Sequence, residues 1–160
     1  MNAAAIEPGK PIPPSTFDAR RHEAVLVANL EVHMIDDMGI FRTTIGVAHV
    51  ARPAERRDLT DVMVDTGSEY NWIPRSVLEE LGIEAVRIDR FETADGRVLE
   101  RDVALALVSA GGRTMGSVVV FGEPGDMVLL GAIGLESLNL KLDLARKELV
   151  PAGPVPVAMA

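Results

Sequence analysis

A carboxylate on a glycine-containing turn is the clearest chemical feature of this 160-residue sequence. The apolar run Val62-Met63-Val64 leads directly into Asp65-Thr66-Gly67-Ser68. A buried strand can deliver an acid to a loop, and two such acids about 3 Å apart share one proton at mild pH. The ionised carboxylate then takes a proton from water, while the protonated one polarises a carbonyl group. The chemistry that this motif favours is hydrolysis by water, without a covalent intermediate.

The residues that follow the acid have the right types to hold it in place. Gly67 lets backbone N–H groups approach the carboxylate closely, because it has no Cβ. Thr66 offers a hydroxyl that could lock the loop, and Ser68 offers one that could donate to Asp65. Asp, Thr and Gly are also common turn residues, so a plain turn stays an alternative for the motif taken alone.

The rest of the chain predicts a mainly β domain with one or two short helices. Alternating apolar residues predict strands, and the Asp95-Gly96 and Gly111-Gly112 pairs predict tight hairpin turns. Pro74 suits the first turn of a helix that Gly82 would end. We expect strands over 40–47, 61–65, 103–108, 115–121, 138–144 and 148–150, helices over 74–81 and 132–138, and a charged loop over 52–57.

Composition excludes several classes of function. The formal charge of −8 and the lack of a basic cluster argue against a nucleic-acid partner. With no cysteine there is no disulfide or thiolate nucleophile, and His22, His33 and His49 are too scattered to predict a metal site. The apolar stretches are too short to span a membrane, and the N-terminus does not read as a signal peptide. We therefore expect a cytoplasmic protein with no membrane partner.

A second motif extends the pattern. Leu129-Leu130-Gly131 precedes the helix expected over 132–138. Together with Asp65-Thr66-Gly67 and Ile73-Pro74, it resembles the retropepsin-like aspartic proteases, especially the bacterial ones. The chain has one Asp-Thr-Gly and too few residues for two lobes, which is similar to retropepsins, whose two identical chains each supply one Asp.

This resemblance implies a small closed β-barrel of the retropepsin type over residues 40–151. Residues 1–39 would be an N-terminal tail or extension, and residues 152–160 a C-terminal tail. Retroviral members usually have arginine after the glycine, where this chain has Ala132. The ion pair that supports the dimer in retroviral members cannot form in the same way here.

The resemblance also implies roles for individual residues and partners. A hairpin with its tip at residues 94–96 would be the flap that closes over a peptide or protein substrate, and no cofactor or metal would be needed. The implied catalytic residues are Asp65, Thr66 and Gly67, and the implied substrate-binding residues are Ser68, Glu69, Ala94, Asp95, Gly96 and Gly131.

The first functional hypothesis is therefore an aspartic endopeptidase whose Asp65 dyad forms across a homodimer. The alternative is a non-catalytic dimer of the same fold that binds peptides or proteins. A third idea, a phosphoryl-transfer loop, fails because the fold that uses it needs a much longer chain. Dimerisation would use the terminal strands, through Leu140, Leu142 and Leu149.

Overall fold

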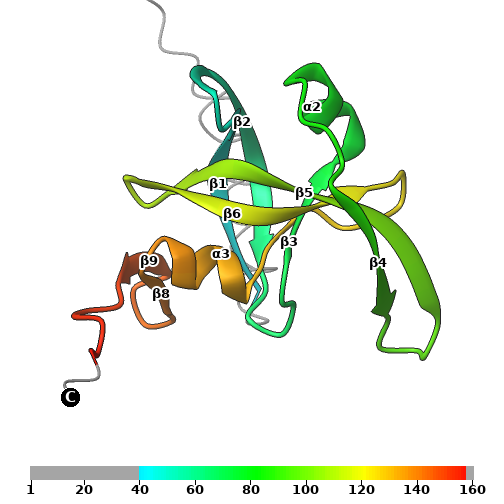
Figure 1. Ribbon diagram of the computed structural model, residues 1–160. Helices are drawn as coiled ribbons and strands as arrows, with labels where there is room; N and C mark the ends of the chain where they lie inside the picture. Colours follow the sequence, from blue (N-terminus) through cyan, green and yellow to red (C-terminus); the bar gives the residue numbers. More distant parts are fainter. Residues whose placement is uncertain (1–39, 158–160) are drawn as a thin grey trace, which may run out of the picture. The chain divides into compact units, whose positions relative to one another are not determined.

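The computed structural model describes residues 40–157 of the chain. The fold is mainly β, with two short helices, as the sequence predicts (Figure 1). The elements are β1 (Phe41–His49), β2 (Arg52–Val64), β3 (Asn71–Pro74), α2 (Arg75–Glu80), β4 (Arg87–Glu92), β5 (Val98–Ala110), β6 (Arg113–Gly122), β7 (Leu129–Leu130), α3 (Ala132–Ser137), β8 (Leu140–Asp143) and β9 (Glu148–Pro151).

Seven strands form one sheet in the order β1-β2-β7-β3-β6-β5-β4. Strand β5 also pairs with β1, so the hydrogen-bonded order returns to its first strand. Two of the pairings, β2 with β7 and β3 with β6, are parallel and join segments far apart in the sequence. Strands β8 and β9 form a separate two-stranded sheet next to α3 (Figure 1).

Aliphatic side chains fill the core, as the scarcity of aromatic residues predicts. The main cluster includes Ile45, Val62, Leu78 and Leu130, which are all fully buried. Each buried Val, Leu or Ile side chain contributes about 1.5–3 kcal/mol relative to an exposed one. A smaller cluster consists of Trp72, Val103, Val120 and Leu129, and Phe91 of β4 packs against it.

One expected element needs correction. The segment Arg52–Arg57 was expected to be a charged loop, and this is wrong because it is the first half of β2. Its backbone pairs with β1, for example Val47 with Arg57, while its side chains stay in solvent. A hairpin arm that is exposed in this way needs no apolar alternation, which is why the sequence pattern did not reveal it.

The other predicted elements are present with small shifts at their ends. Helix α2 spans Arg75–Glu80, and Gly82 follows it with a φ of 67°, as expected for a residue that ends a helix. Helix α3 follows Gly131, and β8 begins at Leu140, two residues later than the alternation suggested.

Candidate active site

The acid of the sequence motif lies at the end of a buried strand. Val64 ends β2, and the next residue, Asp65, donates its backbone N–H to the Leu130 carbonyl at 3.0 Å. Two residues earlier, Met63 N donates to the Val128 carbonyl at 3.2 Å. The parallel β2–β7 pairing thus joins the Asp-Thr-Gly and Leu-Leu-Gly motifs, which lie more than sixty residues apart.

The turn after the strand binds the carboxylate through its own backbone. Gly67 N donates to Asp65 Oδ1 at 2.9 Å, and Ser68 N donates to the Asp65 carbonyl at 3.2 Å. Asp65 is half-buried, whereas Thr66 and Gly67 are exposed. The Ser68 hydroxyl donates to the Tyr70 carbonyl at 3.2 Å, so the expectation that it would bind the carboxylate is wrong. This geometry presents one acid, held by a backbone donor, on an accessible turn.

Asn71 is a supporting residue next to the candidate site that the sequence analysis missed. It is fully buried, and its Oδ1 accepts the Gly131 N–H at 3.0 Å. Its Nδ2 donates to Ser117 Oγ at 2.9 Å and to the Val118 carbonyl at 2.8 Å. A lone Asn between two aromatic residues carries no distinctive sequence signal, so only the three-dimensional structure reveals that it joins β3, β6 and the turn before α3.

Gly131 lies buried where two backbone segments come close together. A Cβ at this position would collide with the Tyr70 carbonyl oxygen and lie 2.8 Å from the Ser68 carbonyl oxygen. Only glycine permits this approach, because any side chain would push the loop over residues 65–70 away. Its proposed contact with substrate stays a prediction, and the structure shows a close contact with the loop instead.

Helix α3 begins against the same loop. Its first N–H groups, which have no partner within the helix, are taken by loop carbonyls. Ala132 N donates to the Ser68 carbonyl at 2.8 Å, and Ile133 N donates to the Glu69 carbonyl at 3.0 Å. The Leu-Leu-Gly-Ala segment therefore supports the catalytic loop from Asp65 to Glu69 along much of its length.

The expected hairpin tip is a tight turn between β4 and β5. Thr93 N donates to the Arg97 carbonyl at 2.8 Å, and Gly96 N donates to the Thr93 carbonyl at 2.8 Å. Gly96 has a φ of 80°, in the left-handed region where glycine carries no Cβ penalty. A hydrogen bond from the Thr93 hydroxyl, with further help from Arg97, lowers the pKa of Asp95. Ala94 completes this exposed tip.

A cleft of about 560 Å³ lies between the loop after Asp65 and strand β4 of the hairpin. Aromatic side chains line part of it, with the Phe91 ring on β4 meeting Trp72 and Tyr70 edge to face at centroid distances of 5.0 Å and 5.8 Å. The lining residues are Gly67, Ser68, Glu69, Tyr70, Trp72 and 89–93. The predicted residues Ser68 and Glu69 thus share this cleft, whereas Ala94, Asp95 and Gly96 lie outside its lining.

Asp65 lines a second groove, of about 700 Å³, and does not line the cleft under the hairpin. Asp65 and Thr66 form one wall, and Leu142 and Leu144 form another. Leu144 is 69% exposed, whereas Leu140 is buried in the main core. The groove therefore brings the candidate catalytic acid next to an open apolar surface of the same chain.

Residues 40–157 hold no group of three or more acidic or histidine side chains placed to bind a metal ion. In the same part of the chain, neither helix is long and apolar enough to cross a membrane.

Comparison with known proteins agrees with this arrangement of motifs. Residues 57–133, just under half of the chain, match the family model described as aspartyl protease. The resemblance to the aspartyl proteases is confirmed. The matched segment runs from the exposed arm of β2 to the second residue of α3. It contains the Asp65 loop, the hairpin and the Leu-Leu-Gly motif.

Two solved structures are similar to the chain at low sequence identity. The solution structure of simian foamy virus (mac) protease has a TM-score of 0.42 and 17% identity, over 59% of this chain and 91% of that chain. The crystal structure of a retropepsin-like aspartic protease from Rickettsia conorii has a TM-score of 0.42 and 18% identity, over 69% and 85%. No match was found among curated proteins.

Proposed function

We propose that this protein is an aspartic endopeptidase whose active form is a homodimer. Asp65 of each chain would supply one carboxyl group of a dyad that activates water against a peptide bond. The observation that carries the proposal is the Asp65 loop. A backbone N–H of Gly67 holds one carboxylate oxygen, and the loop itself is fixed by β7 and α3. The match of residues 57–133 to the aspartyl protease family supports the same reaction.

The sequence contains one Asp-Thr-Gly, so the proposed dyad requires a second copy of the chain. The groove beside Asp65, with exposed Leu144 on its wall, supplies an apolar surface that a second chain would cover. Strands β8 and β9 pair with each other through Leu142 and Leu149, which leaves them as a small sheet available for pairing with a partner. Each protomer would be a closed β-barrel of the retropepsin type.

In this proposal Thr66 and Gly67 hold the acid, and the substrate lies in the cleft under the β4–β5 hairpin. Ser68 and Glu69 would contact the peptide from the loop side. Gly131 would act by permitting the close approach of the loop. The hairpin tip residues Ala94, Asp95 and Gly96 would reach the substrate only when the hairpin closes, because they lie outside the cleft lining.

The substrate would be an extended peptide or protein segment, and no cofactor is required by this chemistry. We also expect a mildly acidic optimum, because one carboxyl group of the dyad must be protonated. Statine-type mimics of the transition state should inhibit the reaction. A cytoplasmic location stays a prediction from the sequence.

The decisive variant is Asp65→Asn, which keeps the size of the side chain and removes the acid. It should abolish peptide cleavage while the far-ultraviolet dichroism and sedimentation of the protein stay unchanged. Asp61→Asn is the matched control, because Asp61 is exposed on the same strand, forms an ion pair with Arg42, and has a φ of 60° that suits Asn. Cleavage that survives in Asp65→Asn would refute the proposal.

The non-catalytic alternative makes a different set of predictions. A dimer that binds peptides but cleaves none of them, with or without Asp65, would support a peptide-binding module. Isothermal titration with a library-derived peptide, run on the native chain and on Asp65→Asn, separates this outcome from catalysis.

A further inference from the structure

The hairpin that covers the cleft leaves the sheet at a well-defined point. Strand β5 pairs with β6 only as far as Val103, which lies opposite Val120. From Val98 to Asp102, β5 pairs with β4 alone. Between Val98 and Asp102, β5 therefore has a paired strand on one side only. The position of the hairpin then depends on side-chain contacts at its base.

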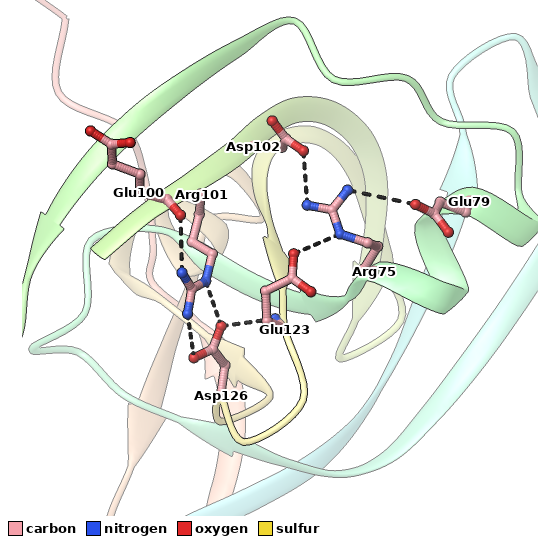
Figure 2. A network of polar contacts seen from close by, with 7 residues as sticks. All are labelled: Arg75, Glu79, Glu100, Arg101, Asp102, Glu123 and Asp126. Atoms are coloured by element: carbon pink, nitrogen blue, oxygen red, sulfur yellow. Dashed lines mark hydrogen bonds and ion pairs between the residues drawn. The ribbon is translucent and has the colours of Figure 1, made fainter. Parts of the chain in front are cut away.

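Arg101 and Asp126 make the most buried ion pair of the described residues, with side-chain exposures of 16% and 15%. The guanidinium donates twice, from Nε to Oδ2 at 2.7 Å and from Nη2 to Oδ1 at 3.0 Å (Figure 2). Asp126 Oδ2 also accepts the Glu123 N–H at 2.8 Å. Such bidentate pairs fix the orientation of both partners as well as their distance. The pair ties the base of the hairpin to the 123–126 loop.

Arg75 makes a second connection at the same place. It donates from Nη2 to Asp102 at 2.8 Å and from Nε to Glu123 at 2.7 Å (Figure 2). Its guanidinium also lies 5.0 Å from the centre of the Phe121 ring. The hydrogen bonds to Asp102 and Glu123 raise the pKa of Arg75. Arg75, the first residue of α2, therefore joins Asp102 of β5 to the 123–126 loop.

The loop that receives these contacts leads directly to the strand that holds the acid. Only Met127 and Val128 separate Asp126 from β7, and the Val128 carbonyl accepts the Met63 N–H. The Leu130 carbonyl accepts the Asp65 N–H. A continuous path of short contacts thus runs from the hairpin base, through the 123–126 loop, to the catalytic turn.

We propose that Arg101 and Asp126 are positioning residues that hold the base of the hairpin against the 123–126 loop and so set the hairpin over the substrate cleft. This inference rests on the proposed peptidase function for its kinetic consequence, but not for its structural one. Neither residue lines the cleft, so their effect on substrate would be indirect, through the position of β4 and Phe91.

Trp72 supplies a readout that does not depend on catalysis. It is the only tryptophan of the chain, it is nearly buried, and it contacts Phe91 on the hairpin. If the hairpin base loosens, Phe91 moves away and the Trp72 ring gains contact with water. Its emission should then shift to longer wavelength, and acrylamide should quench it more strongly.

The experiment compares Arg101→Met, Asp126→Asn, the double variant and Arg101→Lys with the native chain. Arg57→Met is the control, because Arg57 donates two hydrogen bonds to one carboxylate oxygen of Glu80, at 2.9 Å and 2.6 Å, but lies on β2, away from the hairpin. Arg101→Met and Asp126→Asn should each raise KM about fivefold with little change in kcat, and the double variant should add little more. Arg101→Lys should recover part of the loss, and Arg57→Met should behave as the native chain.

Every outcome decides the inference. A shifted Trp72 emission with raised KM supports it. An unchanged Trp72 emission in Arg101→Met and Asp126→Asn overturns it, whatever the kinetics. A shifted emission with unchanged KM overturns the positioning role and leaves a purely structural ion pair. If the native chain cleaves no peptide, the proposed function fails, while the Trp72 emission still decides whether the pair holds the hairpin. If Arg101→Met does not fold, Asp126→Asn and Arg101→Lys make the same test.

Discussion

The side-chain carbonyl of Asn71 accepts the backbone N–H of Gly131 at 3.0 Å, and this contact joins the strand after the catalytic turn to the turn before α3. The two residues belong to segments sixty positions apart. Both are buried, so water cannot replace a lost partner. The geometry around the candidate acid is therefore set partly by a polar residue that takes no part in the proposed chemistry.

Replacing Asn71 should destabilise the domain more than replacing its neighbour. Asn71→Leu keeps the volume but leaves the Gly131 N–H and the Val118 carbonyl without their partner, which should cost about 3 kcal/mol of unfolding free energy. Ser117→Ala removes only one of the contacts of Asn71 and should cost about 1 kcal/mol. Denaturant unfolding measures both, and equal losses in the two variants would argue against this role.

Glycine at position 131 should be required, while glycine at position 116 should not. Gly131→Ala places a Cβ against the Tyr70 and Ser68 carbonyls and should cost about 2 kcal/mol and most of the cleavage activity. Gly116→Ala meets no atom within 4 Å and should change the unfolding free energy by less than about 0.5 kcal/mol. Denaturant unfolding measures the free energy of both variants. A Gly131→Ala protein as stable and active as the native chain would contradict the close packing described.

The Arg101–Asp126 pair should make the free energy of unfolding depend on pH. The hydrogen bond from Arg101 lowers the pKa of Asp126 below its ordinary value of 3.8, with help from the Glu123 N–H and against the effect of burial. A lowered pKa in the folded state means that the stabilisation is complete above the unfolded pKa and is lost as pH falls through the folded one. The native chain should therefore be more stable than Asp126→Asn at pH 6, and the difference should shrink below about pH 4.

Asp58→Asn is the control for that pH series. It breaks the Arg56–Asp58 pair, whose side chains are about half exposed, so its effect on unfolding free energy should be small at every pH. Thermal or urea unfolding between pH 3 and pH 7 provides the comparison. A difference between native chain and Asp126→Asn that grows on acidification would show that the sign is wrong.

Leu144 should matter for association and Leu105 should not, although both are exposed, at 69% and 59%. Leu144 lines the groove beside Asp65, whereas Leu105 lies on β5. Leu144→Glu should weaken the homodimer at least about tenfold, because it places a charge on the surface that the second copy would cover. Sedimentation equilibrium of Leu144→Glu and of the control Leu105→Glu measures the dissociation constant of each dimer. Equal dissociation constants in the two variants would place the interface elsewhere.

The sequence predicted much of this architecture because its signals are local. Asp95-Gly96 marked the hairpin turn, Pro74 and Gly82 bounded α2, and Leu129-Leu130-Gly131 marked the approach to α3. These signals depend on backbone φ preferences and short periodicities, which act within a few residues.

The rest depends on contacts between distant segments. No pattern within β2 or β7 shows that they pair in parallel, and nothing around Asn71 indicates three buried hydrogen bonds. The Arg101–Asp126 pair was missed for the same reason, since charged residues usually lie in solvent. The Arg52–Arg57 strand was missed because an exposed hairpin arm has no apolar alternation.

The central claim is that two chains share one catalytic dyad, and subunit mixing tests it most directly. Native chain and Asp65→Asn are mixed at a fixed total concentration, allowed to exchange partners, and assayed for peptide cleavage at mildly acidic pH. If each active site needs Asp65 from both chains, activity falls with the square of the native fraction, to about one quarter in an equal mixture. Activity that falls in simple proportion, to about one half, would show that each chain acts alone and would contradict the account.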